Sequence, residues 1–113
     1  MNTDMRIMVG MLVGTGLLLS ALAIPMILKK IKPNGLYGFR VRKTMENPEI
    51  WYAVNAYSGK WLFGTGLVEI AAAIGLAFVP SLTLDVYAYG VLAVFAIAFA
   101  VSLIVSVRYM NSL

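Results

Sequence analysis

The side chains that could do chemistry are concentrated in one polar segment and at one isolated acid. Residues 33–59 are rich in proline, glycine, asparagine and basic residues, although the whole chain is 61% hydrophobic. Within this segment Arg40 is the strongest candidate for ligand contact, because a guanidinium can hold a phosphate or carboxylate through two parallel hydrogen bonds. Glu69 stands alone inside a long apolar run. The sequence therefore predicts a binding surface in segment 33–59 and a second polar position at Glu69.

The residue types that the chain lacks narrow the possible chemistry. There is no cysteine and no histidine, which removes thiol nucleophiles, disulfides and the commonest general base and metal ligand. Glu46 and Glu49 are close in sequence, but they stand at a helix start, where acids are expected for electrostatic reasons. We therefore expect no enzyme, no metal site and no cofactor. An enzyme acting on lipid or peptidoglycan precursors is the weakest of the functions considered.

The composition is that of a membrane protein. Only 12% of the residues are charged, against about 25% in a soluble domain, and the mean hydropathy is +0.87. A net charge of +4 suggests nucleic acid at first sight. The cations flank apolar runs instead of forming a basic helix, however, which is how membrane proteins use them. We expect membrane lipid as a partner and no nucleic acid.

Three apolar runs, at residues 7–28, 61–79 and 86–107, are long enough to cross a bilayer as helices of about 20 residues. Ala21-Leu22-Ala23 has the small-residue pattern of a signal-peptide cleavage site. The apolar run continues beyond it and no cationic cluster precedes it, so we expect the first span to be retained. The predicted fold is an all-α integral membrane bundle of three transmembrane helices in a single domain, 1–113. A cytoplasmic loop and a short helix join spans one and two.

The distribution of lysine and arginine predicts the orientation. The connection between spans two and three, residues 80–85, carries no basic residue, and the C-terminal tail carries Arg108. The positive-inside rule therefore places the N-terminus and residues 80–85 outside, and the 29–60 loop and the C-terminus in the cytoplasm, of a multi-pass plasma-membrane protein. The cations of the 29–60 loop are Lys29, Lys30, Lys32, Arg40, Arg42, Lys43 and Lys60.

The polar segment contains local signals for a folded loop and a helix start. Pro33-Asn34-Gly35 is typical of a turn. Asn47-Pro48-Glu49 predicts a helix start, with Asn47 as the cap. Trp51, Asn55 and Gly59 then recur every fourth residue and share one helix face, which we expect to dock on the Pro33–Arg40 loop. Two courses remain open for this helix: it bends near Gly59 and lies along the membrane surface, or it runs straight into span two.

Packing inside the membrane is expected to use small residues and Glu69. Small residues four apart predict close helix contacts at the pairs Gly10/Gly14, Ala71/Gly75 and Ala96/Ala100. A carboxylate at bilayer depth costs about 2.5 kcal/mol or more, so Glu69 should face the bundle interior. Its candidate partners are Thr15, Ser20, Thr65 and Ser102. Glu69 is either a proton or ligand site or a structural contact between helices.

The series Pro-Asn-x-x-Tyr-Gly-x-Arg, followed by Thr44, Asn47, Trp51, Asn55 and Gly59 and flanked by three helices, resembles the SdpI family of bacterial membrane proteins. The founding member is an immunity protein that protects a toxin-producing cell from its own secreted killing peptide. It also signals by holding a transcriptional repressor at the membrane, and it has further transmembrane helices that this chain lacks. The resemblance gives the signature positions Pro33, Asn34, Tyr37, Gly38, Arg40, Thr44, Asn47, Trp51, Asn55 and Gly59.

The resemblance implies an immunity or signal-transduction protein of the bacterial membrane that confers antimicrobial peptide resistance by binding. Its partners would be a toxin peptide or a regulatory protein, and an oligomer is compatible with the sequence. The alternative is a small oligomeric transporter or ion-coupled membrane protein that uses Glu69. The signature residues either contact the partner or fold the loop, and both interpretations stay open.

Overall fold

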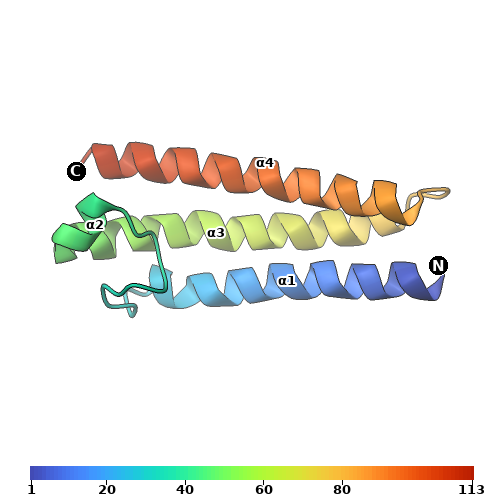
Figure 1. Ribbon diagram of the computed structural model, residues 1–113, viewed down its shortest axis with the longest axis horizontal. Helices are drawn as coiled ribbons and strands as arrows, with labels where there is room; N and C mark the ends of the chain where they lie inside the picture. Colours follow the sequence, from blue (N-terminus) through green and yellow to red (C-terminus); the bar gives the residue numbers. More distant parts are fainter.

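The computed structural model describes all residues, 1–113, and it contains helices and no strands. The helices are α1 (Thr3–Ile27), α2 (Arg42–Glu46), α3 (Pro48–Ala77) and α4 (Leu84–Asn111). Helix α3 lies between α1 and α4, and the two chain ends lie at opposite ends of the bundle (Figure 1). The molecule measures 51 × 22 × 19 Å. The predicted all-α bundle of three long helices is confirmed.

Each long helix has the length and apolar composition needed to cross a membrane. The first and third begin and end within a few residues of the expected spans. The second differs, because α3 runs unbroken for 30 residues from Pro48 to Ala77. The straight course past Gly59 is therefore the correct one. The short helix between spans one and two is α2, which ends just before the Asn47 cap of α3.

Specific backbone caps set the ends of the long helices. At the end of α1, Lys30 N–H donates to Pro25 O at 2.9 Å and Lys29 N–H donates to Met26 O at 3.2 Å. This pair of hydrogen bonds is the Schellman motif. Lys29, at φ 59°, stands in the position that glycine usually occupies. At the start of α4 the cap is Thr83, whose side chain accepts from Val86 N–H. Asp85 lies in the first turn of α4, where an acid complements the positive end of the helix dipole.

Helices α1 and α3 approach most closely at two glycines that the sequence analysis did not pair. A Cβ built on Gly66 would lie 2.5 Å from Gly16 O and 2.1 Å from Ser20 Oγ. Ser20 Oγ donates to Phe63 O at 2.9 Å beside this contact. Glycine is therefore required there, since any larger side chain would push the helices apart.

The three expected small-residue pairs do not form these contacts. A Cβ at Gly10, Gly14 or Gly75 would meet open space, and Ala71, Ala96 and Ala100 are exposed. A spacing of four residues identifies a common helix face, but it does not say which neighbour that face meets. The expectation was wrong for this reason.

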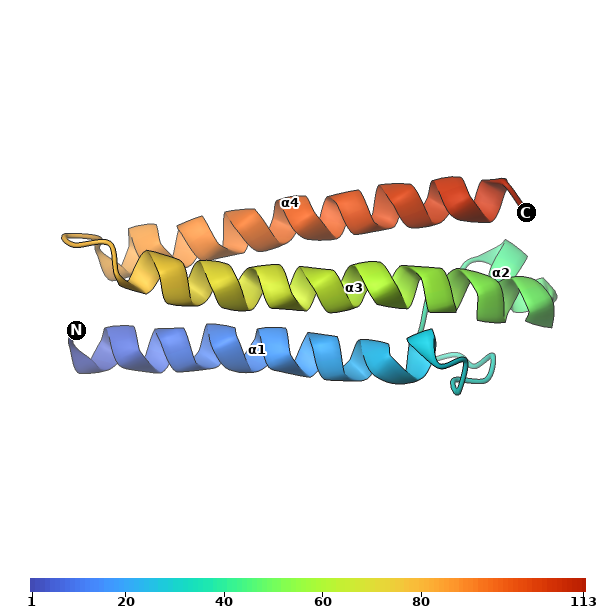
Figure 2. The same ribbon diagram turned by 180° about the vertical axis from the view of Figure 1, so that it is seen from behind.

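The three long helices meet at the end opposite α2. The core there consists of Leu12, Ala73, Tyr87 and Val91, and Tyr87 Oη donates to Ala73 O at 2.6 Å. Towards the other end α4 lies farther from α1, as both views show (Figures 1 and 2). That end carries the connecting segment 29–47, which we call the cap.

Candidate functional site

Asn34 organises the first turn of the cap. Its Oδ1 accepts from Leu36 N–H at 2.8 Å and from Tyr37 N–H at 2.7 Å. Its Nδ2 donates to Lys32 O at 2.7 Å and to Tyr37 O at 3.1 Å. Because one side-chain amide closes four hydrogen bonds to the backbone, the loop has a defined shape without regular secondary structure.

Trp51 and Asn55 on α3 hold this loop against the bundle, as the shared helix face predicted. Trp51 Nε1 donates to Ile31 O at 2.8 Å. Asn55 Oδ1 accepts from Phe39 N–H at 2.6 Å, while its Nδ2 donates to Trp51 O at 2.9 Å. Trp51 is fully buried and Asn55 is 2% exposed. A buried amide with all these bonds made is a strong anchor, because losing one would leave a buried backbone group unpaired.

Two signature glycines allow the loop and the end of α1 to approach α3 closely. Gly38 has φ +109°, and a Cβ there would lie 2.7 Å from Asn55 Oδ1. Gly59 faces the end of α1, where a Cβ would lie 3.0 Å from Met26 Cβ and 3.1 Å from Ala23 O. The Trp51–Asn55–Gly59 face therefore docks on two elements: the first two residues meet the loop, and Gly59 meets α1.

Thr44 and Asn47 cap the two helices that follow the loop. Thr44 Oγ1 accepts from Val41 N–H at 3.0 Å and lies 2.9 Å from Phe39 O. Asn47 Oδ1 accepts from Glu49 N–H at 3.0 Å at the start of α3, as the sequence predicted.

The cap is also attached to α4 by a contact that the sequence did not predict, since Lys43 Nζ donates to Met110 O at 3.1 Å. Nearby, the ring of Tyr57 on α3 stacks on the ring of Tyr109 on α4 at 4.2 Å. A lysine that pairs with the last carbonyls of a helix is a known arrangement. The partners are far apart in sequence, however, so no local pattern signalled the contact.

The remaining signature residues lie nearer the surface. Pro33 is exposed, and Arg40 is exposed with its guanidinium donating to Gly35 O. Tyr37 is half-buried, and its hydroxyl is enclosed without a hydrogen-bond partner. Burial raises the pKa of Tyr37 above its ordinary value of 10.0. Most signature side chains therefore build the cap, and Arg40 keeps its charged group outward.

The outer surface at this end of the molecule is cationic. The cations with exposed side chains at this end are Lys29, Lys30, Lys32, Arg40, Arg42, Lys60 and Arg108. One of them, Arg42, forms an ion pair with Glu46 at 2.9 Å, which contributes little because both groups are in solvent. The others leave a net positive surface suited to lipid phosphates or carboxylates.

A groove between α3 and α4 begins just below the cap, and sequence reasoning missed it. Its volume is about 350 Å³, and Lys60 and Trp61 lie at the end nearest the cap. Thr65 contributes the one hydroxyl in the lining, and this hydroxyl donates to Trp61 O at 2.8 Å. The groove therefore offers an apolar trough with one free ammonium group. The lining residues are Lys60, Trp61, Gly64, Thr65, Val68, Ala98 and Val101.

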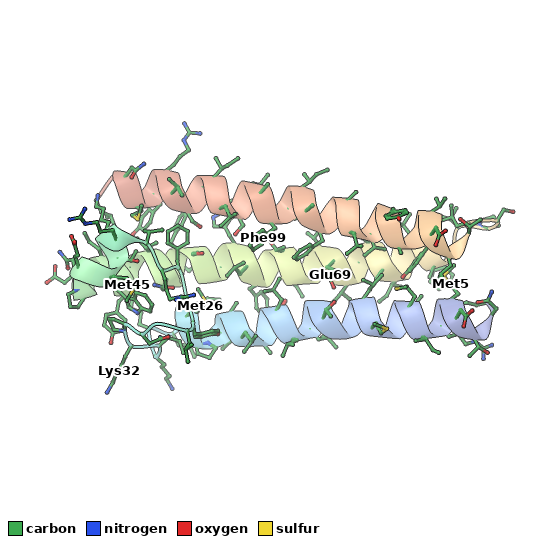
Figure 3. All side chains as sticks on the ribbon, in the orientation of Figure 1. Met5, Met26, Lys32, Met45, Glu69 and Phe99 are labelled. Carbon is green, nitrogen blue, oxygen red and sulfur yellow. The ribbon has the colours of Figure 1, made fainter.

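Glu69 lies midway along the bundle, apart from the cap (Figure 3). It is 5% exposed, and its Oε2 lies 2.5 Å from Thr15 Oγ1. Of the four candidate partners Thr15 is the one that pairs with Glu69. The hydroxyls of Ser20 and Thr65 bond backbone carbonyls, and that of Ser102 is buried without a partner. The expectation that Glu69 faces the bundle interior is confirmed.

These features together define a three-span membrane protein whose polar signature folds a cationic cap on one end of the bundle. A family model for the SdpI/YfhL protein family matches residues 30–106, which include most of the cap, all of α3 and most of α4. The chain belongs to this family, and its three long apolar helices agree with a multi-pass membrane protein. No curated protein and no solved structure matches the chain.

Proposed function

We propose that this protein protects the membrane of the cell that makes it by binding an apolar killing peptide. The peptide would lie in the α3–α4 groove, close to the cytoplasmic face of the membrane. This proposal extends the family-level assignment to a binding site and a ligand class. The groove is the observation that carries it.

The groove fits a peptide that has already entered the bilayer. It is open on the lipid-facing side of the helices, and Val68 and Val101 are each more than 40% exposed. An apolar side chain gains little hydrophobic energy by leaving lipid for such a groove. The close packing of a shaped surface therefore has to supply the attraction. Gly64 and Ala98 provide the necessary depth, since their side chains are small.

Lys60 gives the groove a direction. Its exposed ammonium stands at the cap end, where it can pair with a carboxylate, such as the C-terminus or an acidic side chain of the peptide. Charge-assisted hydrogen bonds of this kind are about twice as strong as neutral ones. The exposed cations of the cap would extend the same positive field to a larger surface. An apolar peptide with an acidic end is therefore the ligand class that the groove suits.

Binding accounts for the groove better than turnover does. Its one hydroxyl, on Thr65, is engaged with a backbone carbonyl, so no nucleophile is paired with a base there. Ion-coupled transport is also less well supported. The cleft beside Glu69 is lined by leucine and phenylalanine side chains and provides no polar path for an ion.

Survival of a sensitive strain provides the test. The strain would express the wild-type protein and be challenged with the killing peptide that the founding member of the family neutralises, and with a panel of other secreted apolar peptides. We expect the wild type to raise survival at least tenfold against one of these peptides. Gly64→Leu should abolish the protection, because the larger side chain fills the groove.

Gly75→Leu is the matched control. Both glycines lie on α3, and a Cβ at either position would meet open space, but only Gly64 lines the groove. Membrane levels of both variants would be measured on immunoblots. Equal protection by the two variants would rule out the groove as the binding site. Lack of protection by the wild type against every peptide would contradict the immunity function.

A further inference from the structure

The contact between Glu69 and Thr15 lies deep in the membrane. Glu69 is eight residues from the end of α3 at Ala77, or about 12 Å at 1.5 Å per residue. Because the hydrocarbon core is about 30 Å thick, the carboxyl group lies near its middle. Figure 3 shows Glu69 far from the labelled residues at both ends of the bundle, Met5 and Lys32.

Both contacts of the Thr15 hydroxyl are satisfied as hydrogen bonds when Glu69 carries a proton. Thr15 Oγ1 lies 3.0 Å from Leu12 O, which can only accept, and 2.5 Å from Glu69 Oε2. A threonine hydroxyl carries one proton. If that proton is donated to Leu12 O, the second bond can form only when the carboxyl group donates to Thr15. Both contacts are satisfied together by a protonated Glu69 and not by a carboxylate.

The surroundings favour the same state, because no cation is close enough to compensate a carboxylate. No salt bridge involves Glu69. Tyr87 Oη, on the facing side of α4, is committed to Ala73 O. An uncompensated carboxylate at this depth costs about 2.5 kcal/mol or more. The charged residues nearest along the chain are Arg6 on α1 and Lys29 just after it, Lys60 on α3, and Asp85 and Arg108 on α4.

The acid is reachable from the lipid. A cleft of about 230 Å³ lies beside it, lined by leucines of α1, by Phe95 of α4 and by Thr15 and Glu69 themselves. Glu69 Oε1 makes no hydrogen bond and is not among the enclosed polar atoms. Because Oε2 contacts Thr15, Oε1 is the oxygen that is accessible from the cleft. The lining leucines are Leu18, Leu19 and Leu22.

We propose that Glu69 and Thr15 form a proton-binding site in the middle of the membrane. Glu69 is held there as a neutral acid that donates to Thr15, and small apolar molecules reach it from the hydrocarbon through the cleft. The ligand of this site is a proton. The site is separate from the α3–α4 groove, so it stands whether or not the groove binds a peptide.

Infrared spectroscopy of the protein in lipid bilayers at pH 7 tests the protonation state. The difference spectrum between wild type and Glu69→Gln should contain the C=O stretching band of a protonated carboxylic acid. Thr15→Val should move this band to higher wavenumber, because the acid loses its hydrogen-bond acceptor. A carboxylate band in place of the acid band would overturn the proposal, and so would an acid band that Thr15→Val leaves unmoved.

Carbodiimide labelling of the wild type provides a second test that needs no variant to fold. Apolar dicyclohexylcarbodiimide, added to protein in bilayers at pH 7, should form an adduct on Glu69 that peptide mapping by mass spectrometry locates. A water-soluble carbodiimide should instead label the exposed Glu46 and Glu49 and leave Glu69 unmodified. Failure of the apolar reagent to label Glu69, or labelling of Glu69 by the water-soluble reagent alone, would contradict a neutral acid that is reached from the lipid through the cleft.

Discussion

At the scale of single residues, Asn55 shows how this family signature works. Its oxygen receives the backbone of the loop and its nitrogen returns a bond to its own helix. Asn55 thus joins the loop to α3, two segments that share no helical or sheet hydrogen bonds. Asn34 does the same within the loop. Side chains with both a donor and an acceptor suit this role, which is why asparagine, and not a charged residue, occupies both positions.

Gly38→Ala should destabilise the cap. The substitution puts a side chain at a positive φ and within 2.7 Å of Asn55 Oδ1, so we expect a loss of about 1–3 kcal/mol in the free energy of unfolding. Unfolding of the protein in detergent micelles, followed by circular dichroism, gives this value. Gly35→Ala is the control, since a Cβ at Gly35 would meet open space in the same loop. Equal losses for the two variants would rule out the proposed contact.

Tyr37 predicts a stability change at high pH. Burial raises the pKa of its hydroxyl above 10.0, so the unfolded chain ionises first as the pH rises. The contribution of neutral Tyr37 is therefore fully present below pH 10 and is lost as the pH approaches the raised value. Tyr37→Phe should remove this part of the pH dependence, as measured by unfolding between pH 8 and 11. If the free energy of unfolding changed with pH in the same way for the wild type and for Tyr37→Phe, the enclosed position of the hydroxyl would be contradicted.

At this scale the sequence predicted contacts within one helix or one turn. The role of Asn47 as the N-cap of α3, and the shared face of Trp51, Asn55 and Gly59, followed from rules that link residues four or fewer apart. The bond from Lys43 to Met110 O and the Thr15 partner of Glu69 depend on how separate helices are arranged. Thr15 was one of four candidates for this reason, and Lys43 was assigned only a topological role.

At the scale of helices, the closest backbone contact decides how α1 and α3 sit together. Gly16 and Gly66 bring the two backbones together, and this places Ser20 beside Phe63 O and Thr15 beside Glu69. The glycine contact and the polar contacts are therefore parts of one interface. Helix lengths were predictable from apolar runs. The rotation of each helix was not, which is why the wrong small residues were expected to pack.

Gly66→Ala should separate these helices. The added carbon would overlap Ser20 Oγ and Gly16 O, and overpacking of this kind costs about 1–3 kcal/mol. Gly64→Ala, two residues away with open space around its Cβ, should change stability by about 0.5 kcal/mol or less. Titration of each purified protein with a denaturing detergent measures both values. The interface described above would be wrong if the two variants unfolded at the same point.

At the scale of the whole molecule, nearly all the exposed positive charge lies at the end that carries the cap. The positive-inside rule would set this end in the cytoplasm. The chain has no cysteine, so a single introduced cysteine is a unique label. Ser81→Cys, in the exposed α3–α4 connection, should react with an impermeant maleimide on intact cells. Leu36→Cys, which replaces a residue that is 92% exposed in the cap, should react only after the membrane is opened. The reverse pattern would invert the proposed orientation.

The central claim is that an apolar peptide binds in the groove below the cap. Photo-crosslinking tests it most directly. A benzophenone-bearing residue would replace either Val68, which lines the groove, or Ile74, which does not. The two side chains lie on α3 and are similarly exposed, at 43% and 46%. We predict a crosslink to a protective peptide from position 68 and none from position 74. Equal crosslinking at the two positions, or crosslinking at position 74 alone, would contradict the claim.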